Sequence, residues 1–234
     1  MSVEPYQQPS FASRLREHAR REGRTRVAAR MARWGLDALV PRGGAFTYDG
    51  ERYALLRRLY GLTWTTERAV EVPVAQRLLE RHRAERILEV GNVLSHYMPV
   101  EHEVVDKYEH AAGVRNLDVL DLEPEPDYGL ILSVSTLEHV GSDEKPRDPE
   151  RAVAAFEHLR RLLRPGGMLF ATVPAGYNPA LDAGLARGGH RLRALRRDPW
   201  REVDPAEALA CPYDFLVYRA DAVLFVTADA VRSP

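Results

Sequence analysis

The sequence predicts an α/β fold: a Rossmann-like, doubly wound and mostly parallel sheet with helices on both faces. From residue 86 onward, apolar segments of strand length alternate with helical patterns, which is typical of a parallel sheet. The segment Leu130 to Ser135 is an almost unbroken apolar run, as expected of a central strand buried on both faces. A length of 234 residues suits one domain with an extension.

The N-terminal part is predicted to be helical. Residues from Phe11 to Trp34 are rich in arginine and carry apolar side chains at loose helical spacing. The segment is expected to be a solvated helix that lies over the main domain; a contact for an acidic partner, a substrate or a membrane surface is the alternative. We therefore assign residues 1–65 to an N-terminal helical extension or lid and residues 66–234 to the main domain.

Residues 41–83 connect this extension to the sheet. A break is expected at 41–44, followed by a short strand or turn at 46–53 and a helix from Tyr53 to Tyr60. The next helix is predicted to begin near Pro73 and to reach Arg83, because proline is tolerated in the first turn of a helix but not in its interior.

The expected strands of the sheet follow in order. They are Ile87 to Val90, Val104 to Asp106, Gly113 to Leu117, Leu130 to Ser135, Met168 to Val173 and a final reversed strand, Ala222 to Thr227. Asp148-Pro149-Glu150 predicts a helix start, with a side-chain cap and a proline at the first helical position, and 165–167 (Pro-Gly-Gly) predicts its end. A further helix is expected from Asn178 to Arg187.

Composition and charge argue against several classes of protein. The formal net charge is −1, so nucleic acid is not an expected partner. No apolar run approaches the roughly 18 residues of a membrane span, and the polar first residues predict no secretory signal. The single cysteine, Cys211, cannot form an intrachain disulfide, which fits a cytoplasmic location.

An aspartate and a glycine stand where a nucleoside would bind. In a doubly wound sheet the turn after the first strand lies under the ligand, and Gly91 lets a ligand approach the backbone there. Asp106 ends the second strand, where a carboxylate can accept hydrogen bonds from both ribose hydroxyls. The alternative for Asp106 is a carboxylate that caps the residues after it.

A dinucleotide site is not expected. That site needs three glycines in the pattern Gly-x-Gly-x-x-Gly, whereas this chain has Gly91, Val93 and His96. Few free backbone amides would then face a pyrophosphate. A ligand without phosphate suits this loop better.

The order and spacing of these segments resemble the class I S-adenosylmethionine (SAM) methyltransferases. The anchors are Ile87 to Gly91, Val104 to Asp106, Leu130 to Val140 and Leu163 to Phe170, and the resemblance covers roughly Phe46 to Thr227. The segment from Ser133 to Gly141 is similar to a subgroup associated with bacterial glycan or secondary-metabolite pathways. Val93 and Ser95 depart from the family, which usually has glycine at both positions.

The resemblance implies a SAM site and names its residues. Those expected to contact the cofactor are Glu89, Gly91, Asn92, Asp106, Asp118 and Ser133. Asp118 would meet the adenine amino group, and Asp121 is a nearby competitor for that position. Without the usual glycines, a non-catalytic protein that keeps the SAM fold as a binding module or scaffold is the alternative to an enzyme.

His139 is the candidate catalytic residue. A neutral imidazole at the end of the fourth strand could take the proton of a substrate hydroxyl, with Glu138 orienting it; the alternative is that both residues only stabilise the loop. Adjacent Glu138 and His139 also resemble part of a metal site, but Ser135 stands where a further ligand would be needed, so no metal is expected.

The acceptor is expected to be a small molecule or a glycan. The candidate substrate contacts are Arg68, Glu138, Tyr177 and Asn178. Arg68 could instead pair with the SAM carboxylate or form a surface salt bridge. The predicted activity is therefore SAM-dependent methyl transfer to a hydroxyl, with a homodimer left open.

Overall fold

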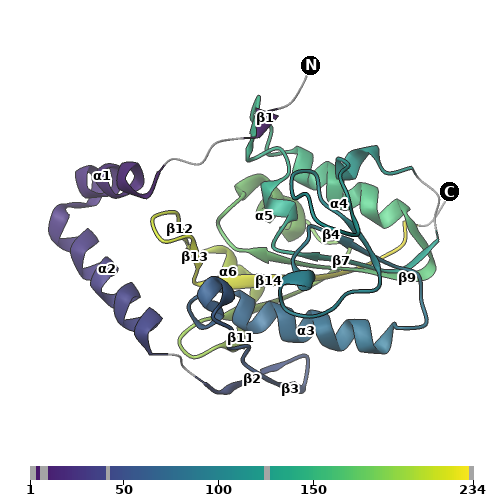
Figure 1. Ribbon diagram of the computed structural model, residues 1–234, viewed down its shortest axis with the longest axis horizontal. Helices are drawn as coiled ribbons and strands as arrows, with labels where there is room; N and C mark the ends of the chain where they lie inside the picture. The colour runs from purple at the N-terminus through teal and green to yellow at the C-terminus, as the bar shows by residue number, and fades with distance from the viewer. Residues whose placement is uncertain (1–3, 6–9, 41–42, 124–126, 232–234) are drawn as a thin grey trace.

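The computed structural model describes residues 4–5, 10–40, 43–123 and 127–231. Its central sheet contains β4 (Ile87–Val90), β5 (Glu103–Val105), β6 (Val114–Arg115), β7 (Tyr128–Val134), β9 (Leu163–Pro174), β10 (Arg191–Arg196), β11 (Arg201–Val203) and β14 (Ala222–Asp229). The strand order is β11-β10-β14-β9-β7-β4-β5-β6 (Figure 1). The chain thus winds outward in both directions from β4, which is the prediction made from the sequence.

The direction of the strands divides the sheet into two parts. β4, β5, β6, β7 and β9 run parallel, whereas β14 pairs antiparallel with β9 and with β10. The expected reversed strand at Ala222 to Thr227 is therefore confirmed. The parallel strands end at one edge of the sheet, and their loops gather there.

Both faces of the sheet are covered by apolar side chains. Four helices surround it: α3 (Arg68–Arg81), α4 (Arg151–Arg161), α5 (Pro179–Ala186) and α6 (Pro205–Leu209). Along β7, Ile131 packs with α4 and α5, while Leu130 and Leu132 pack with α3 on the other side. Figure 1 shows α3 on the side of the sheet opposite α4 and α5. β7 is buried along its whole length, as its apolar run predicts.

The N-terminal segment forms two helices rather than one. α1 (Phe11–Glu22) and α2 (Arg24–Leu39) meet at Gly23, whose φ of +93° ends the first helix. The hairpin of β2 (Ala45–Tyr48) and β3 (Glu51–Ala54) follows and packs into the core beside α3.

Short elements complete the chain. They are the 3₁₀ segments η1 (Tyr60–Thr65), η2 (Leu94–His96), η3 (Val119–Asp121) and η4 (Leu137–His139), and the strand pairs β1 (Glu4–Pro5) with β8 (Glu144–Lys145) and β12 (Tyr213–Asp214) with β13 (Arg219–Ala220). The pair β12–β13 faces α1 and α2 in Figure 1.

Helix α3 begins five residues earlier than the sequence suggested. It starts at Arg68 and contains Pro73 in its interior. Proline has no N–H to donate to the carbonyl of Ala69, four residues earlier. The backbone N–H of Leu56 donates to that carbonyl instead, at 2.9 Å. The helix therefore tolerates proline because a neighbouring segment supplies the missing donor.

Three other sequence-based boundaries were wrong. The predicted helix from Tyr53 to Tyr60 is absent: after β3, the N–H of Leu55 donates to Gly44 and that of Leu56 to Ala69, so these amides are not available to a local helix. α4 begins at Arg151 rather than at the Asp148-Pro149 cap. Residues 165–167 belong to β9, where they form an irregularity in its pairing with β7.

Gly176 should be the less replaceable of two glycines with matched backbone conformation. Its φ is +82° and an added Cβ would lie 2.8 Å from the Cys211 carbonyl oxygen, whereas Gly188 has a φ of +88° and open space around it. Gly188→Ala should cost about 1–2 kcal/mol of conformational strain, and Gly176→Ala on the order of 1–3 kcal/mol more for the clash. Urea unfolding of both variants measures the difference; equal losses would contradict the close packing at Gly176.

Candidate active site

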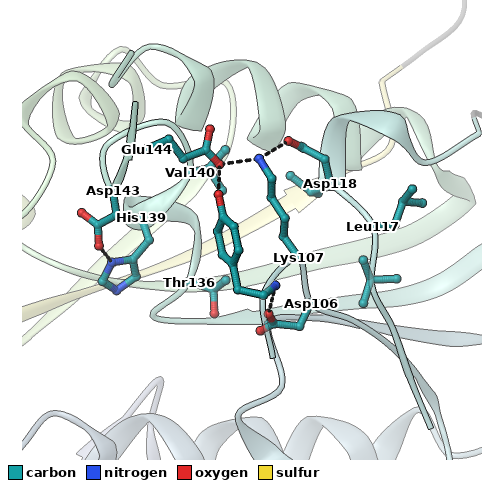
Figure 2. Close-up of a pocket in the computed structure, with 13 residues that line it drawn as sticks. Asp106, Lys107, Leu117, Asp118, Thr136, His139, Val140, Asp143 and Glu144 are labelled. Carbon is teal, nitrogen blue, oxygen red and sulfur yellow. Dashed lines mark hydrogen bonds and ion pairs between the residues drawn. The ribbon is translucent and has the colours of Figure 1, made fainter. Parts of the chain in front are cut away.

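A cavity of about 360 Å³ opens at the carboxyl edge of the sheet, beyond the ends of β4 and β5 (Figure 2). It is lined by Gly91, Val105, Asp106, Lys107, Tyr108, Leu117, Asp118, Val119, Thr136, His139, Val140, Asp143 and Glu144. Four residues predicted from the sequence to form the site, Gly91, Asp106, Asp118 and His139, therefore lie in one cavity. Its lining combines carboxylates with apolar side chains, which gives it the character of a small-molecule site.

Gly91 brings the loops after β4 and β7 together. Its φ is +89°, and an added Cβ would lie 2.1 Å from Oγ1 of Thr136. The Gly91 N–H donates to the carbonyl of Val105 at 2.8 Å, which fixes the turn against the end of β5. Glycine is required here because a side chain would push the two loops apart.

The Asp106 carboxylate organises the loop at the end of β5. Its Oδ1 accepts the backbone N–H groups of Tyr108 (2.9 Å) and Glu109 (2.8 Å), and its Oδ2 accepts that of Asn92 at 3.1 Å. The capping role considered as the alternative is thus present. Because each carboxylate oxygen has two acceptor positions, Oδ2 can still accept one further hydrogen bond from a ligand in the cavity.

Lys107 crosses one wall of the cavity and joins two carboxylates. Its Nζ donates to Asp118 Oδ2 at 2.8 Å and to Glu144 Oε1 at 2.7 Å, and the Tyr108 hydroxyl donates to the same Glu144 oxygen at 3.0 Å (Figure 2). Burial lowers the pKa of Lys107, but the two hydrogen-bonded carboxylates outweigh it and the pKa is raised. Lys107 is therefore a permanent cation that ties the loop after β7 to the loop after β5.

Neighbouring groups already donate hydrogen bonds to most acceptor positions of the Asp118 carboxylate. Its Oδ2 also accepts from Arg151 at 3.0 Å, and its Oδ1 accepts the N–H of Leu120 at 3.0 Å. Burial raises the pKa of Asp118, but these hydrogen bonds and the Lys107 and Arg151 charges outweigh it and the pKa is lowered. One acceptor position on Oδ1 is left. Asp121, the competitor for this position, is exposed and does not line the cavity.

His139 forms a hydrogen-bonded chain with two other residues. Its Nδ1 lies 2.7 Å from Asp143 Oδ2, and the Tyr177 hydroxyl donates to both Asp143 oxygens at 3.0 and 2.8 Å. Asp143 therefore orients the imidazole, rather than Glu138, whose Oε1 lies 3.6 Å from Nε2. Burial lowers the pKa of His139, but the Asp143 hydrogen bond and the charges of Glu138 and Asp143 outweigh it, so the pKa is raised.

Glu138 is a buried acid beside His139. The residue is 1% exposed, and its Oε2 has no hydrogen-bond partner among the described residues. Burial raises the pKa of Glu138 to about 8, against the opposing effect of His139. The side chain therefore keeps its proton to a higher pH than an exposed glutamate does.

Three residues expected to contact the cofactor lie outside the cavity. Glu89 is fully buried, and its carboxylate accepts the N–H groups of Val93 and Leu94 at 3.0 and 2.8 Å. Asn92 donates to Glu109 at 2.6 Å, and Ser133 is fully buried within β7. In this structure Glu89 and Asn92 shape the loop that borders the cavity.

The two departures from the glycine pattern do not obstruct the cavity. Val93 packs against the apolar core beside α3, and the Ser95 hydroxyl donates to Asn92 Oδ1 at 2.5 Å. Neither residue is among those that line the cavity.

Two residues expected to contact the substrate, Arg68 and Asn178, form hydrogen bonds within the protein instead. Arg68 donates to Glu71 at 2.8 Å and to the Val134 carbonyl at 3.2 Å. Asn178 is fully buried: its Oδ1 caps α5, and its Nδ2 donates to Ser142 at 2.8 Å and to the Glu138 carbonyl at 3.2 Å. Asn178 thereby holds the loop that carries Glu138 and His139.

Sequence reasoning missed three charged residues of the cavity. Asp143 stands four residues after His139, and Lys107 directly follows Asp106; these spacings were the available signals. Glu144 carried none, because its role arises only from the approach of Lys107 and Tyr108 across the cavity.

The sheet order and the reversed strand β14 together decide the fold. The chain has the Rossmann-like, doubly wound α/β fold that the sequence predicted. No model of a known protein family matches it, and a search of curated proteins finds no match either.

Solved structures with a similar fold include several methyltransferases. One is 1,6-didemethyltoxoflavin-N1-methyltransferase from Burkholderia thailandensis, with bound S-adenosylhomocysteine (14% identity, 98% of this chain and 95% of that chain covered, TM-score 0.44). Another is a possible histamine N-methyltransferase from Thermotoga maritima (15%, 67% and 95%, 0.37). A third is a sugar N-methyltransferase from Streptoalloteichus (16%, 57% and 59%, 0.34).

Two further kinds of site were sought. Within the described ranges, no three metal-binding side chains of histidine, cysteine, aspartate or glutamate lie close enough to share an ion. In the same part of the chain, none of the helices combines the length and apolar character that crossing a bilayer requires.

Glu138→Gln should make the protein more stable in alkali. The unfolded-state pKa is about 4.5 and the folded-state pKa about 8, so the native state binds more protons between these values and stability falls as pH rises through them. The glutamine variant lacks this loss, on the order of a few kcal/mol. Its stability advantage in urea unfolding should therefore grow from pH 5 to pH 8. Glu101→Gln, at an exposed position, is the control; the same trend in both variants would contradict the assignment.

Proposed function

We propose that this protein is a SAM-dependent methyltransferase that acts on a hydroxyl of a small-molecule or sugar acceptor. The observation that carries the proposal is the joint presence of Asp106 and His139 in one cavity at the carboxyl edge of the sheet. In folds of this type, ligands bind at this edge, where the direction of winding reverses.

The residues of the cavity suit an adenosine group. Asp106 has an acceptor position left for a ribose hydroxyl, and Asp118 has one left for the adenine amino group. Leu117, Val119 and Val140 form an apolar wall against which a purine can pack. Glycine at position 91 lets the loops after β4 and β7 close together at the border of the cavity. These features support SAM as the cofactor.

SAM supplies an activated methyl group on a positively charged sulfur. The protein's main contribution is to align the acceptor and to exclude water, which can lower the barrier by on the order of 7–11 kcal/mol. His139 provides the base: since Asp143 accepts from Nδ1, the neutral ring carries its proton there and leaves Nε2 to receive the hydroxyl proton. Tyr177 holds Asp143 in place.

A non-catalytic scaffold with the same fold is the second candidate. It is favoured by the Asp118 carboxylate, which Lys107 and Arg151 already occupy in part. The two proposals differ in whether the cavity binds SAM, and this can be measured without an acceptor.

Calorimetric titration with SAM tests the cofactor. The wild type should bind it, and Asp106→Ala should weaken binding by about tenfold or more, because a charge-assisted hydrogen bond contributes about 1.5–3 kcal/mol. Asp121→Ala, at an exposed aspartate outside the cavity, should bind as the wild type does. No heat of binding at millimolar SAM would remove the enzyme proposal and leave the scaffold.

The role of His139 as the base is tested by measuring its pKa and the pH dependence of the rate. NMR should give His139 a pKa above the usual range in the wild type and a lower one in Asp143→Asn, because the charged partner is lost. With an acceptor found by screening hydroxyl compounds, the rate should rise with pH through the His139 pKa. His139→Gln should lower it by about 10²–10⁴. An unchanged rate in His139→Gln would exclude this residue as the base.

A further inference from the structure

A second cavity, of about 540 Å³, lies between the N-terminal helices and the strand pair β12–β13. Arg30 and Arg33 of α2 line one wall, and Asp214, Arg219 and Asp221 line the other. Figure 1 shows α1 and α2 standing apart from the sheet on the side where β12 and β13 project. This cavity is separate from the one that holds Asp106.

The charges of this second cavity are balanced locally. Arg30 pairs with Glu22 at 3.1 Å and with Asp214 at 3.5 Å, while Arg219 lies 3.6 Å from Asp37 and 4.0 Å from Asp221. Each of these two cations therefore has acidic neighbours, and no excess positive charge is left to attract a phosphate or carboxylate ligand. The walls carry both donors and acceptors, a combination that matches hydroxyl groups because a hydroxyl both donates and accepts.

Aromatic rings connect the second cavity to the catalytic candidate. Tyr213 lines the cavity, and its ring centroid lies 4.9 Å from that of Tyr177, which in turn lies 4.6 Å from that of His139. Phe215 packs against Tyr213 at 4.8 Å and is 40% exposed. Tyr177 itself is buried, so an acceptor that reaches His139 would extend over the exposed ring of Phe215, whose centroid lies 5.4 Å from that of Tyr177, toward the polar walls. Aromatic faces beside hydroxyl-binding groups suit a sugar ring, which has apolar C–H faces and polar edges.

We propose that the cavity between α2 and β12–β13 binds a neutral sugar unit of the acceptor, next to the unit that is methylated. The acceptor is then a glycan or glycoside of at least two units. This inference rests on the proposed function and adds a substrate class to it. The N-terminal helices form one wall of that site, which gives the predicted extension of residues 1–65 a role in acceptor binding.

Saturation-transfer NMR with maltose, in the presence of S-adenosylhomocysteine, tests the sugar site. Ala29 lines the cavity and is exposed on α2, so Ala29→Trp should fill the space. Ala28→Trp, at the neighbouring exposed position outside the cavity, is the matched control. The wild type and Ala28→Trp should bind maltose with a millimolar Kd, and Ala29→Trp should raise that Kd by about tenfold or more.

The outcomes separate the sugar site from the enzyme proposal. Glucose 1-phosphate and glucuronate should bind no more tightly than maltose. Tighter binding of the two anions, absence of maltose binding, or equal maltose binding by Ala29→Trp and Ala28→Trp would each overturn the sugar site. Calorimetry with S-adenosylhomocysteine is read independently: if the wild type fails to bind it, the proposed function fails, whatever the result with maltose.

Discussion

Carboxylates that accept backbone N–H groups hold the loops at the carboxyl edge of the sheet, and the geometry of the site depends on them. Glu89 fixes the loop after β4, Asp106 fixes the loops after β4 and β5, and Asp118 begins η3. Backbone amides at such an edge have no strand partner, and burying them without an acceptor would be costly. Asp106 and Asp118 also bring negative charge to the cavity, so at these two residues loop stability and ligand recognition share the same carboxylates.

In the loop after β7, the pKa values of two adjacent titratable side chains are raised by different causes. Glu138 and His139 are adjacent in sequence, yet burial raises the pKa of Glu138 while Asp143 helps to raise that of His139. Burial thus favours the protonated form of Glu138, and the Asp143 carboxylate favours the protonated form of His139. Asn178 holds the backbone of this loop from below, through the Glu138 carbonyl. The imidazole is therefore positioned before any acceptor arrives.

The sequence predicted the central fold well because apolar runs are a local signal. The strands at Ile87 to Val90 and Leu130 to Ser135 were recognised within two residues of their ends, and with them the positions of Gly91 and Asp106. Features that depend on tertiary partners were not predictable. The start of α3 was misplaced because the amide of Leu56 comes from another segment. Glu144 was missed because it joins the cavity only through the approach of Lys107 and Tyr108 in the folded chain.

The proline in the middle of α3 has an evolutionary consequence. As long as residue 73 is proline, the Ala69 carbonyl needs a donor from elsewhere, and the backbone of Leu56 supplies it. Residue 56 can therefore vary in side chain among related proteins but should not itself become proline. Descendants in which position 73 has mutated to another amino acid would be released from that restriction, so tolerance at the two sites should change together.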